Sequence, residues 1–166
     1  MKRFLLSVCF MSVFAAGVFA QEASTFRVSL LNVPSDKIVN GVDIGLLATS
    51  CKEVRGAQLG SFYAGVSDKI IGHQNALVTN GNIVEGYQDG FINIGKDVSG
   101  HQYGFINIAG RMNGVQTCFL NVSSEVNGMQ IGVLNITQKM HGIQIGLLNI
   151  ISKGPLPAMV LFNASF

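Results

Sequence analysis

The amino-acid sequence predicts an all-β fold made of ten tandem strand repeats of about 14 residues each. The first observation is a glycine that recurs at steps of 15, 16 and then 14 residues five times in succession, a short period typical of a repeat architecture. The second is the abundance of β-branched and aromatic residues in each repeat, which suit a pleated strand. The third is a second glycine inside most repeats, because an interior glycine costs a helix about 1 kcal/mol. The recurring glycines are Gly41, Gly56, Gly72, Gly86, Gly100, Gly114, Gly128 and Gly142.

The first twenty residues are expected to be a secretory signal peptide, which leaves residues 21–166 as a single domain. Lys2 and Arg3 supply the basic n-region, residues 4–16 the apolar stretch, and residues 18–20 a small-residue cleavage site. The apolar stretch is too short to be a stable bilayer span. We therefore expect the chain to be exported.

The charge balance argues against a nucleic-acid partner. Without Lys2 and Arg3, the eleven basic residues of the chain fall to nine, which equals the nine acidic ones. A nucleic-acid binder needs a basic excess to release counterions. Only 12% of the residues are charged and the mean hydropathy is +0.41, which excludes disorder and indicates much apolar surface to be covered. Cys51 and Cys118 fall at different positions of the repeat, so we expect two unpaired thiols.

Polar amides and small residues occupy fixed columns in the repeat, counted from the opening glycine as position zero. A second glycine recurs at position four, with Ala76 and Cys118 as small substitutes. We expect the amides to form a structural polar column in which neighbours satisfy each other's hydrogen bonds. The alternative is a lumen through which small polar solutes pass. The glutamines at position two are Gln58, Gln74, Gln88, Gln102, Gln116, Gln130 and Gln144, with Asp43 in the first unit, and the asparagines at position seven are Asn93, Asn107, Asn121, Asn135 and Asn149.

Each unit is expected to be a strand with a bend just after the second glycine. Apolar side chains at positions one, three and five share one face of a regular strand, whereas those at six and eight would fall on the other face. A bulge or bend restores a single apolar face and leaves Gly, Gln and Asn on the opposite one. About three residues remain for each turn, such as residues 95–97, and most of the charges after Gly41 lie in these turns.

The two ends extend the repeat. Residues 26–33 match the second half of a unit, and Asn163 lies 14 residues after Asn149. These atypical members bring the count to ten, as expected when terminal repeats act as caps. Apolar residues alternate from Val160 to Phe166, a pattern similar to the C-terminal signal of outer-membrane barrel proteins.

Two architectures fit this pattern. We expect an antiparallel up-and-down β-barrel in a bacterial outer membrane, with the apolar face toward lipid and the amides toward the lumen. Tilted strands that take up most of one repeat span the roughly 25 Å apolar band of such barrels. The alternative is a β-solenoid, in which each unit is one coil and the amide columns stack as ladders. A barrel requires antiparallel neighbours and pairing of the first strand with the last, whereas a solenoid keeps those ends far apart.

The repeat is similar to that of a known group of proteins. The units GVQTCFLNV, GMQIGVLNI and GIQIGLLNI follow the pattern GxQxGxxN and then an aliphatic residue, with a cysteine for the second glycine in the first of them. This pattern resembles the repeat of bacterial surface-repeat proteins of the leptospiral type. The resemblance covers Gly41 to Ile150 and the end PLPAMVLFNASF. It implies an exported cell-envelope protein and leaves the molecular role unassigned.

The sequence shows no catalytic constellation, so we expect neither an enzyme nor a cofactor. His73, Tyr87 and His101 occupy position one of three consecutive units, but metals usually need three or four ligands and no carboxylate column joins them. A second row has phenylalanine at position five of three units, which would face lipid in a barrel and the core in a solenoid. Its members are Phe91, Phe105 and Phe119.

The expected function is that of an exported cell-envelope structural protein. The barrel interpretation predicts a small outer-membrane protein, with a structural or narrow-pore role, whose partners are outer-membrane lipid and the barrel-assembly machinery. The solenoid interpretation predicts a periplasmic or surface-exposed module that binds or adheres through its Gln/Asn face. Neither interpretation identifies a ligand.

Overall fold

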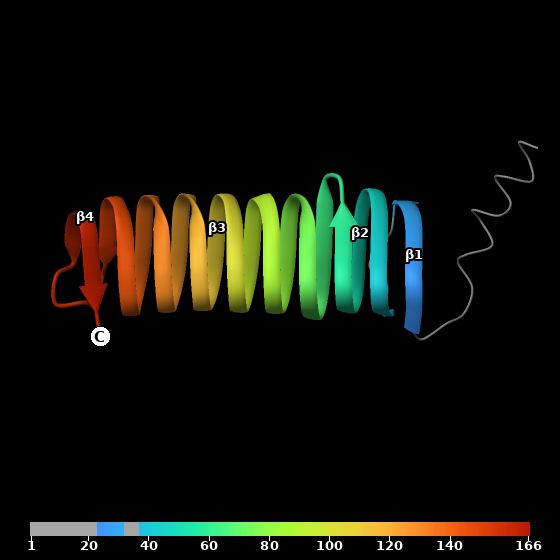
Figure 1. The fold of residues 1–166 in the computed structure, drawn as a ribbon, viewed down its shortest axis with the longest axis horizontal. Coiled ribbons are helices and arrows are strands. Elements are labelled where there is room, and N and C mark those ends of the chain that lie inside the picture. Colours follow the sequence, from blue (N-terminus) through green and yellow to red (C-terminus); the bar gives the residue numbers. More distant parts are fainter. Residues whose placement is uncertain (1–22, 32–36) are drawn as a thin grey trace, which may run out of the picture.

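The computed structural model describes residues 23–31 and 37–166, which form an all-β structure without helices (Figure 1). Its strands are β1 (Ala23–Leu31), β2 (Ile38–Gly60), β3 (Tyr63–Ile151) and β4 (Ala158–Ser165). They form one sheet in the order β1-β2-β3-β4. The predicted all-β class is therefore confirmed. The signal peptide predicted for residues 1–20 and the end of the first predicted repeat lie outside the described residues.

The chain winds into a rod of stacked coils, each of which lies beside the previous one (Figure 1). β1 pairs in parallel with β2, and β2 pairs in parallel with β3. The register places equivalent residues of neighbouring coils side by side, as in the pairs Gly56↔Gly72 and Gln58↔Gln74. β3 is 89 residues long because the strand continues around successive coils without interruption. This winding is that of a β-solenoid.

The predicted antiparallel barrel is wrong. The sheet is open, because β1 and β4 do not pair and lie at opposite ends of the rod (Figure 1). The ten separate strands are wrong as well, since the described residues form four long strands. The physical reason is that the chain stays extended where reversals were predicted, for example at residues 95–97 and 123–125. Each of these segments forms a corner of the coil, after which the chain continues to wind in the same direction.

The opening glycine of each unit makes the winding possible. All eight opening glycines have positive φ between 133° and 144°, a conformation that residues with a Cβ rarely adopt. They also stack directly on one another, so that an added Cβ at Gly114 would overlap the carbonyl oxygen of Gly100. Position zero must therefore be glycine for two independent reasons, backbone conformation and contact between coils.

The predicted bend after the second glycine is present as a corner of the coil. At Phe91 and Ile92, the two residues that follow Gly90, neither side chain is buried, whereas the flanking Gln88 and Asn93 are. Consecutive outward side chains require the strand to turn, because a straight strand alternates its faces. A similar corner lies at Lys96 and Asp97, which places charge on the outside of the coil.

The interior of the rod is narrow and holds both apolar and amide side chains. The apolar side chains come mainly from the position two residues before each opening glycine, and they are at most 7% exposed. They form a continuous hydrophobic cluster along the rod. The members from that column are Val39, Val54, Ile70, Val84, Val98, Met112, Val126 and Met140.

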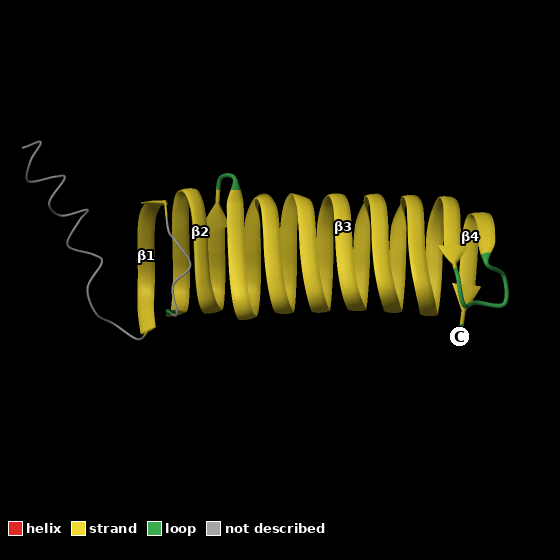
Figure 2. Cartoon of the chain, turned by 180° about the vertical axis from the view of Figure 1, so that it is seen from behind, coloured by secondary structure: helices red, strands yellow, loops and turns green. Residues whose placement is uncertain are grey.

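Within residues 37–166, two features interrupt the regular winding. A loop at Ser61 and Phe62 joins β2 to β3 and projects from the coil (Figure 2). At the C-terminal end the chain reverses, and β4 pairs antiparallel with the last coil, with Gln144 opposite Asn163. β4 therefore covers the end of the rod instead of adding another parallel coil.

Gly114→Ala tests the requirement for glycine at position zero. The backbone conformation alone disfavours alanine by about 1–3 kcal/mol, and the overlap with Gly100 adds to this. We expect a loss of at least about 2 kcal/mol in the free energy of unfolding, measured by denaturant titration followed by circular dichroism. The control is Asn113→Ala at the exposed neighbouring position, which should change the free energy by less than about 0.5 kcal/mol. Equal stability of the two variants would contradict the winding.

Candidate functional site

The glutamine column lies inside the rod and forms a hydrogen-bonded ladder. Its seven side chains are at most 1% exposed. From Gln74 onward, each Nε2 donates to the Oε1 of the glutamine one coil earlier, as from Gln102 to Gln88 (2.7 Å) and from Gln116 to Gln102 (2.7 Å). The same nitrogen of Gln88 also donates to the carbonyl of Ile94 (3.1 Å), six residues later. These backbone acceptors fix the direction of the ladder, because the carbonyl oxygens can only accept.

The asparagine column forms a second ladder that runs in the opposite direction. Nδ2 of Asn93 donates to Oδ1 of Asn107 (2.8 Å), one coil later, and Nδ2 of Asn121 donates to Asn135 (2.8 Å). The second proton of Asn121 goes to the carbonyl of Ile131 (3.0 Å). At its start, the hydroxyl of Thr79 donates to Oδ1 of Asn93 (2.6 Å). The amide donors of the two ladders therefore point toward opposite ends of the rod.

The Gln/Asn face expected to bind partners is not a surface in this structure. The structure places all twelve predicted column residues in the interior, where each one makes side-chain hydrogen bonds. Their carboxamides contact other amides and backbone carbonyls instead of solvent. A partner would have to unwind the coils to reach them.

The N-terminal end of the glutamine ladder is an ion pair. Gln58 donates to the carboxylate of Asp43 (3.2 Å), which also accepts hydrogen bonds from Thr49 and from Nε and Nη2 of Arg27 (both 2.7 Å). The Asp43 side chain is fully buried and that of Arg27 is 13% exposed. Burial opposes the charge of Arg27, but the hydrogen bonds and attraction of Asp43 outweigh it and raise its pKa. A carboxylate can end the ladder here because it only accepts.

Sequence reasoning missed the partners of Asp43. The sequence shows that aspartate replaces glutamine at position two of the first unit. Its partners Arg27 and Thr49 lie 16 residues before it and six residues after it, outside that column of the repeat. A buried acid in a column of neutral amides was the available signal for a buried cation nearby. The neighbouring Cys51 thiol is held neutral, because burial raises its pKa to about 12.

The C-terminal end of the ladder lies beneath β4. Gln144 donates to Gln130 (2.7 Å) and to the carbonyl of Ile150 (3.2 Å). Its buried Oε1 accepts no hydrogen bond from the described residues. Asn163 of β4 donates instead to backbone carbonyls, including that of Leu156 (3.0 Å). The glutamine ladder therefore ends on an acceptor oxygen, and the asparagine ladder on the donating amide of Asn149.

The outer corner of the coil carries an exposed row of apolar side chains, which we call the apolar stripe. Phe91, Phe105 and Phe119 lie at its centre and are 51%, 43% and 50% exposed. Their rings stack, with centroids 4.9 and 5.0 Å apart. The expectation that a solenoid would bury this row in its core is wrong, because the inward positions hold amides. The members of the stripe, all at position five, are Leu77, Phe91, Phe105, Phe119, Val133 and Leu147.

The row at position one is also on the outside of the rod. The rings of His73 and Tyr87 lie 6.4 Å apart, and those of Tyr87 and His101 lie 6.2 Å apart. His101 Nε2 lies 3.2 Å from the hydroxyl of Thr117. In residues 23–31 and 37–166, no group of three His, Cys, Asp or Glu side chains lies where it could hold a metal ion.

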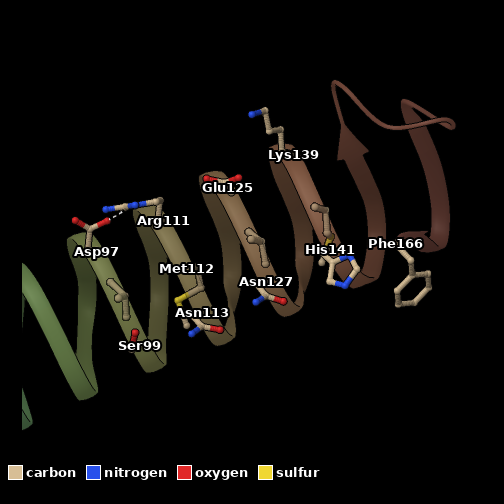
Figure 3. A pocket seen from close by; sticks show the side chains of 13 residues that line it. Asp97, Ser99, Arg111, Met112, Asn113, Glu125, Asn127, Lys139, His141 and Phe166 are labelled. Atoms are coloured by element: carbon tan, nitrogen blue, oxygen red, sulfur yellow. Dashed lines mark hydrogen bonds and ion pairs between the residues drawn. The ribbon is translucent and has the colours of Figure 1, made fainter.

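A different corner of the coil carries charges of alternating sign. Figure 3 shows Asp97, Arg111, Glu125 and Lys139 on successive coils, beside a groove of about 780 Å³. Arg111 donates to Asp97 (2.5 Å), and this hydrogen bond lowers the pKa of Asp97 and raises that of Arg111. The alternation places opposite charges beside each other in the parallel stack, where like charges would repel.

The comparisons with known proteins add no relative to this description. No protein family, no curated protein and no solved structure matches the chain. In the described part of the chain, no helix is long and apolar enough to cross a membrane.

Variants of Gln102 test the glutamine ladder. Gln102→Leu removes one donor and one acceptor, which leaves Oε1 of Gln88 and Nε2 of Gln116 without their partners, at a cost of about 1–3 kcal/mol each. Gln102→Glu keeps the acceptor but places a carboxylate against the carbonyl of Ile108. We expect both variants to lower the free energy of unfolding at pH 7. The exposed Gln138 provides controls, since Gln138→Leu and Gln138→Glu should leave stability nearly unchanged.

The stability of the Gln102→Glu variant should also depend on pH. Its buried carboxyl group needs a proton to donate to Gln88, so its pKa in the folded state should lie above the unfolded value of about 4.3. Stability relative to the parent is then highest below pH of about 4 and falls as the pH rises through the folded-state pKa. Denaturant titrations between pH 4 and pH 8 measure this. A pH-independent difference from the parent would contradict a buried ladder.

Proposed function

We propose that this chain is an exported cell-envelope structural protein. In this proposal it is a stiff rod with a non-catalytic role that binds a partner through its outer apolar side chains. The signal-peptide pattern of residues 1–20 supports export, and the GxQxGxxN resemblance supports an envelope location. The proposed location is the periplasm or the cell surface, including the face of the outer membrane.

The observation that carries the proposal is the inverted distribution of polarity. Gln102 is fully buried, whereas Phe105, three residues later, is 43% exposed. The buried amide ladders give the rod a fixed shape through hydrogen bonds, and the apolar side chains of the stripe remain available for contact. An exposed apolar surface of this extent is typical of an interaction site. The barrel-assembly machinery is not part of the proposal, because that partner was expected only for a closed barrel.

Expression and fractionation in a Gram-negative bacterium test export and location. We expect the full chain to be processed after Ala20, to be recovered in the envelope fraction, and to be released from membranes by an alkaline wash. Intact mass of the purified protein identifies the new N-terminus at Gln21. The control is Phe14→Arg, which places a charge in the apolar stretch and should keep the unprocessed chain in the cytoplasm.

Two outcomes would contradict the proposal. One is recovery of the parent chain in the cytoplasm with Met1 to Ala20 retained. The other is full resistance to the alkaline wash, which indicates an integral membrane protein rather than a rod that lies in or on the envelope.

A further inference from the structure

The apolar stripe is part of a broad and mostly uncharged surface. Positions six and eight, next to the stripe, carry further exposed aliphatic side chains, including Ile94, Ile108 and Leu148 at 37–40% exposure. Between Gly72 and Ile151, Asp89 is the only charged residue at positions three, five, six and eight. The charged corner of Figure 3 lies five to six residues further along each coil. One side of the rod is therefore apolar over six successive units.

The area of this surface matches what a stable dimer needs. Each half-exposed phenylalanine offers roughly 100 Å². With the aliphatic side chains of the six units, the surface is on the order of 800 Å² per copy, the usual contribution of one partner to a specific interface. Monomeric proteins rarely expose a contiguous apolar patch of this size.

The chemistry of the surface favours a second copy over a lipid bilayer. A surface that docks on a membrane commonly has lysine and arginine near its apolar residues, where they contact lipid headgroups. Positions three, five, six and eight hold no lysine or arginine between Gly72 and Ile151. Apart from Asp89, the surface carries no charge, so two copies can meet with little repulsion and without burial of an unpaired cation.

The spacing of the side chains also fits a second copy. Phe91, Phe105 and Phe119 repeat once per coil, with ring centroids about 5 Å apart. A second copy has the same spacing, so the side chains of one stripe can pack against those of the other along their whole length, as in paired sheets of identical strands.

We infer that this protein forms a side-by-side dimer with a second copy of itself, in which the two apolar stripes pack against each other. The dimer buries the phenylalanine rows and leaves the charged corners in water. This inference rests on the proposed function in one respect. The proposed function gives the outer apolar side chains a partner, and the inference identifies that partner as a second copy of the chain. It concerns the folded protein itself and does not depend on where the protein is located.

Sedimentation velocity of the purified chain in detergent-free buffer tests the inference. We expect a dimer at micromolar concentration. Phe105→Lys combined with Phe119→Lys should raise the dissociation constant at least 100-fold, because each dimer would then bury four ammonium groups. Circular dichroism of the double variant should remain that of a β-protein, since both side chains point outward. Asn113→Lys is the matched control, since it adds a cation on the groove side and should leave the dimer intact.

Several results would overturn the inference. A monomeric parent at 50 µM would do so whatever the variants show. A dimer that persists in the correctly folded double variant would place the interface elsewhere on the rod. Binding of a monomeric parent to phosphatidylcholine vesicles, lost in the double variant, would identify lipid as the partner of the stripe. Failure of export in the fractionation experiment would refute the proposed location but would leave the sedimentation result unchanged.

Discussion

A buried carboxamide has two protons and an oxygen, and each needs a hydrogen-bond partner if the amide is to leave water without a large loss of free energy. The structure of this protein depends on how that constraint is met. From Gln74 onward, each glutamine donates one proton to the glutamine one coil earlier, and most donate the other to a backbone carbonyl of their own coil. Except at Gln144, the oxygen accepts from the next coil. The constraint is satisfied only when equivalent residues lie one coil apart, so the amides determine the register of the stack.

The other features follow from this register. The opening glycines allow each coil to close directly on the previous one, because their positive φ turns the chain without a side chain between the coils. The two ladders are oriented in opposite directions, so the dipoles of their amides largely oppose each other along the rod. Where the repeat changes at the first unit, Asp43 replaces the amide and Arg27 neutralises it. With amides and one main apolar column inside, the phenylalanine row and many leucine and isoleucine side chains lie on the outer face, and this distribution carries the functional proposals.

The sequence was sufficient to predict the all-β class and the bend after the second glycine, but not the number of strands or the direction of neighbouring ones. Alternation of amides with aliphatic residues is the same whether the amides line a closed barrel or stack in a solenoid, and local pattern does not distinguish a reversal from a corner. One signal was present. In antiparallel hairpins, the sequence separation of neighbours changes along the strand, so a 14-residue period brings equivalent residues together near one position of the unit only. Repetition of both a glutamine and an asparagine column is therefore useful only to a parallel stack. The sign alternation of Asp97, Arg111 and Glu125 has the same explanation. Inward amides were expected only for the barrel, whose lumen they would line, whereas the solenoid was expected to have an apolar core and an outer Gln/Asn face.

Hydrogen exchange of the side-chain amides tests the central claim most directly. In a uniformly ¹⁵N-labelled sample transferred to deuterated buffer, the side-chain NH₂ signals of Gln88, Gln102 and Gln116 should persist at least 100 times longer than that of the exposed Gln138. Exchange of the ladder amides at the same rate as Gln138 would show that they contact water, and would contradict a rod held together by buried amides.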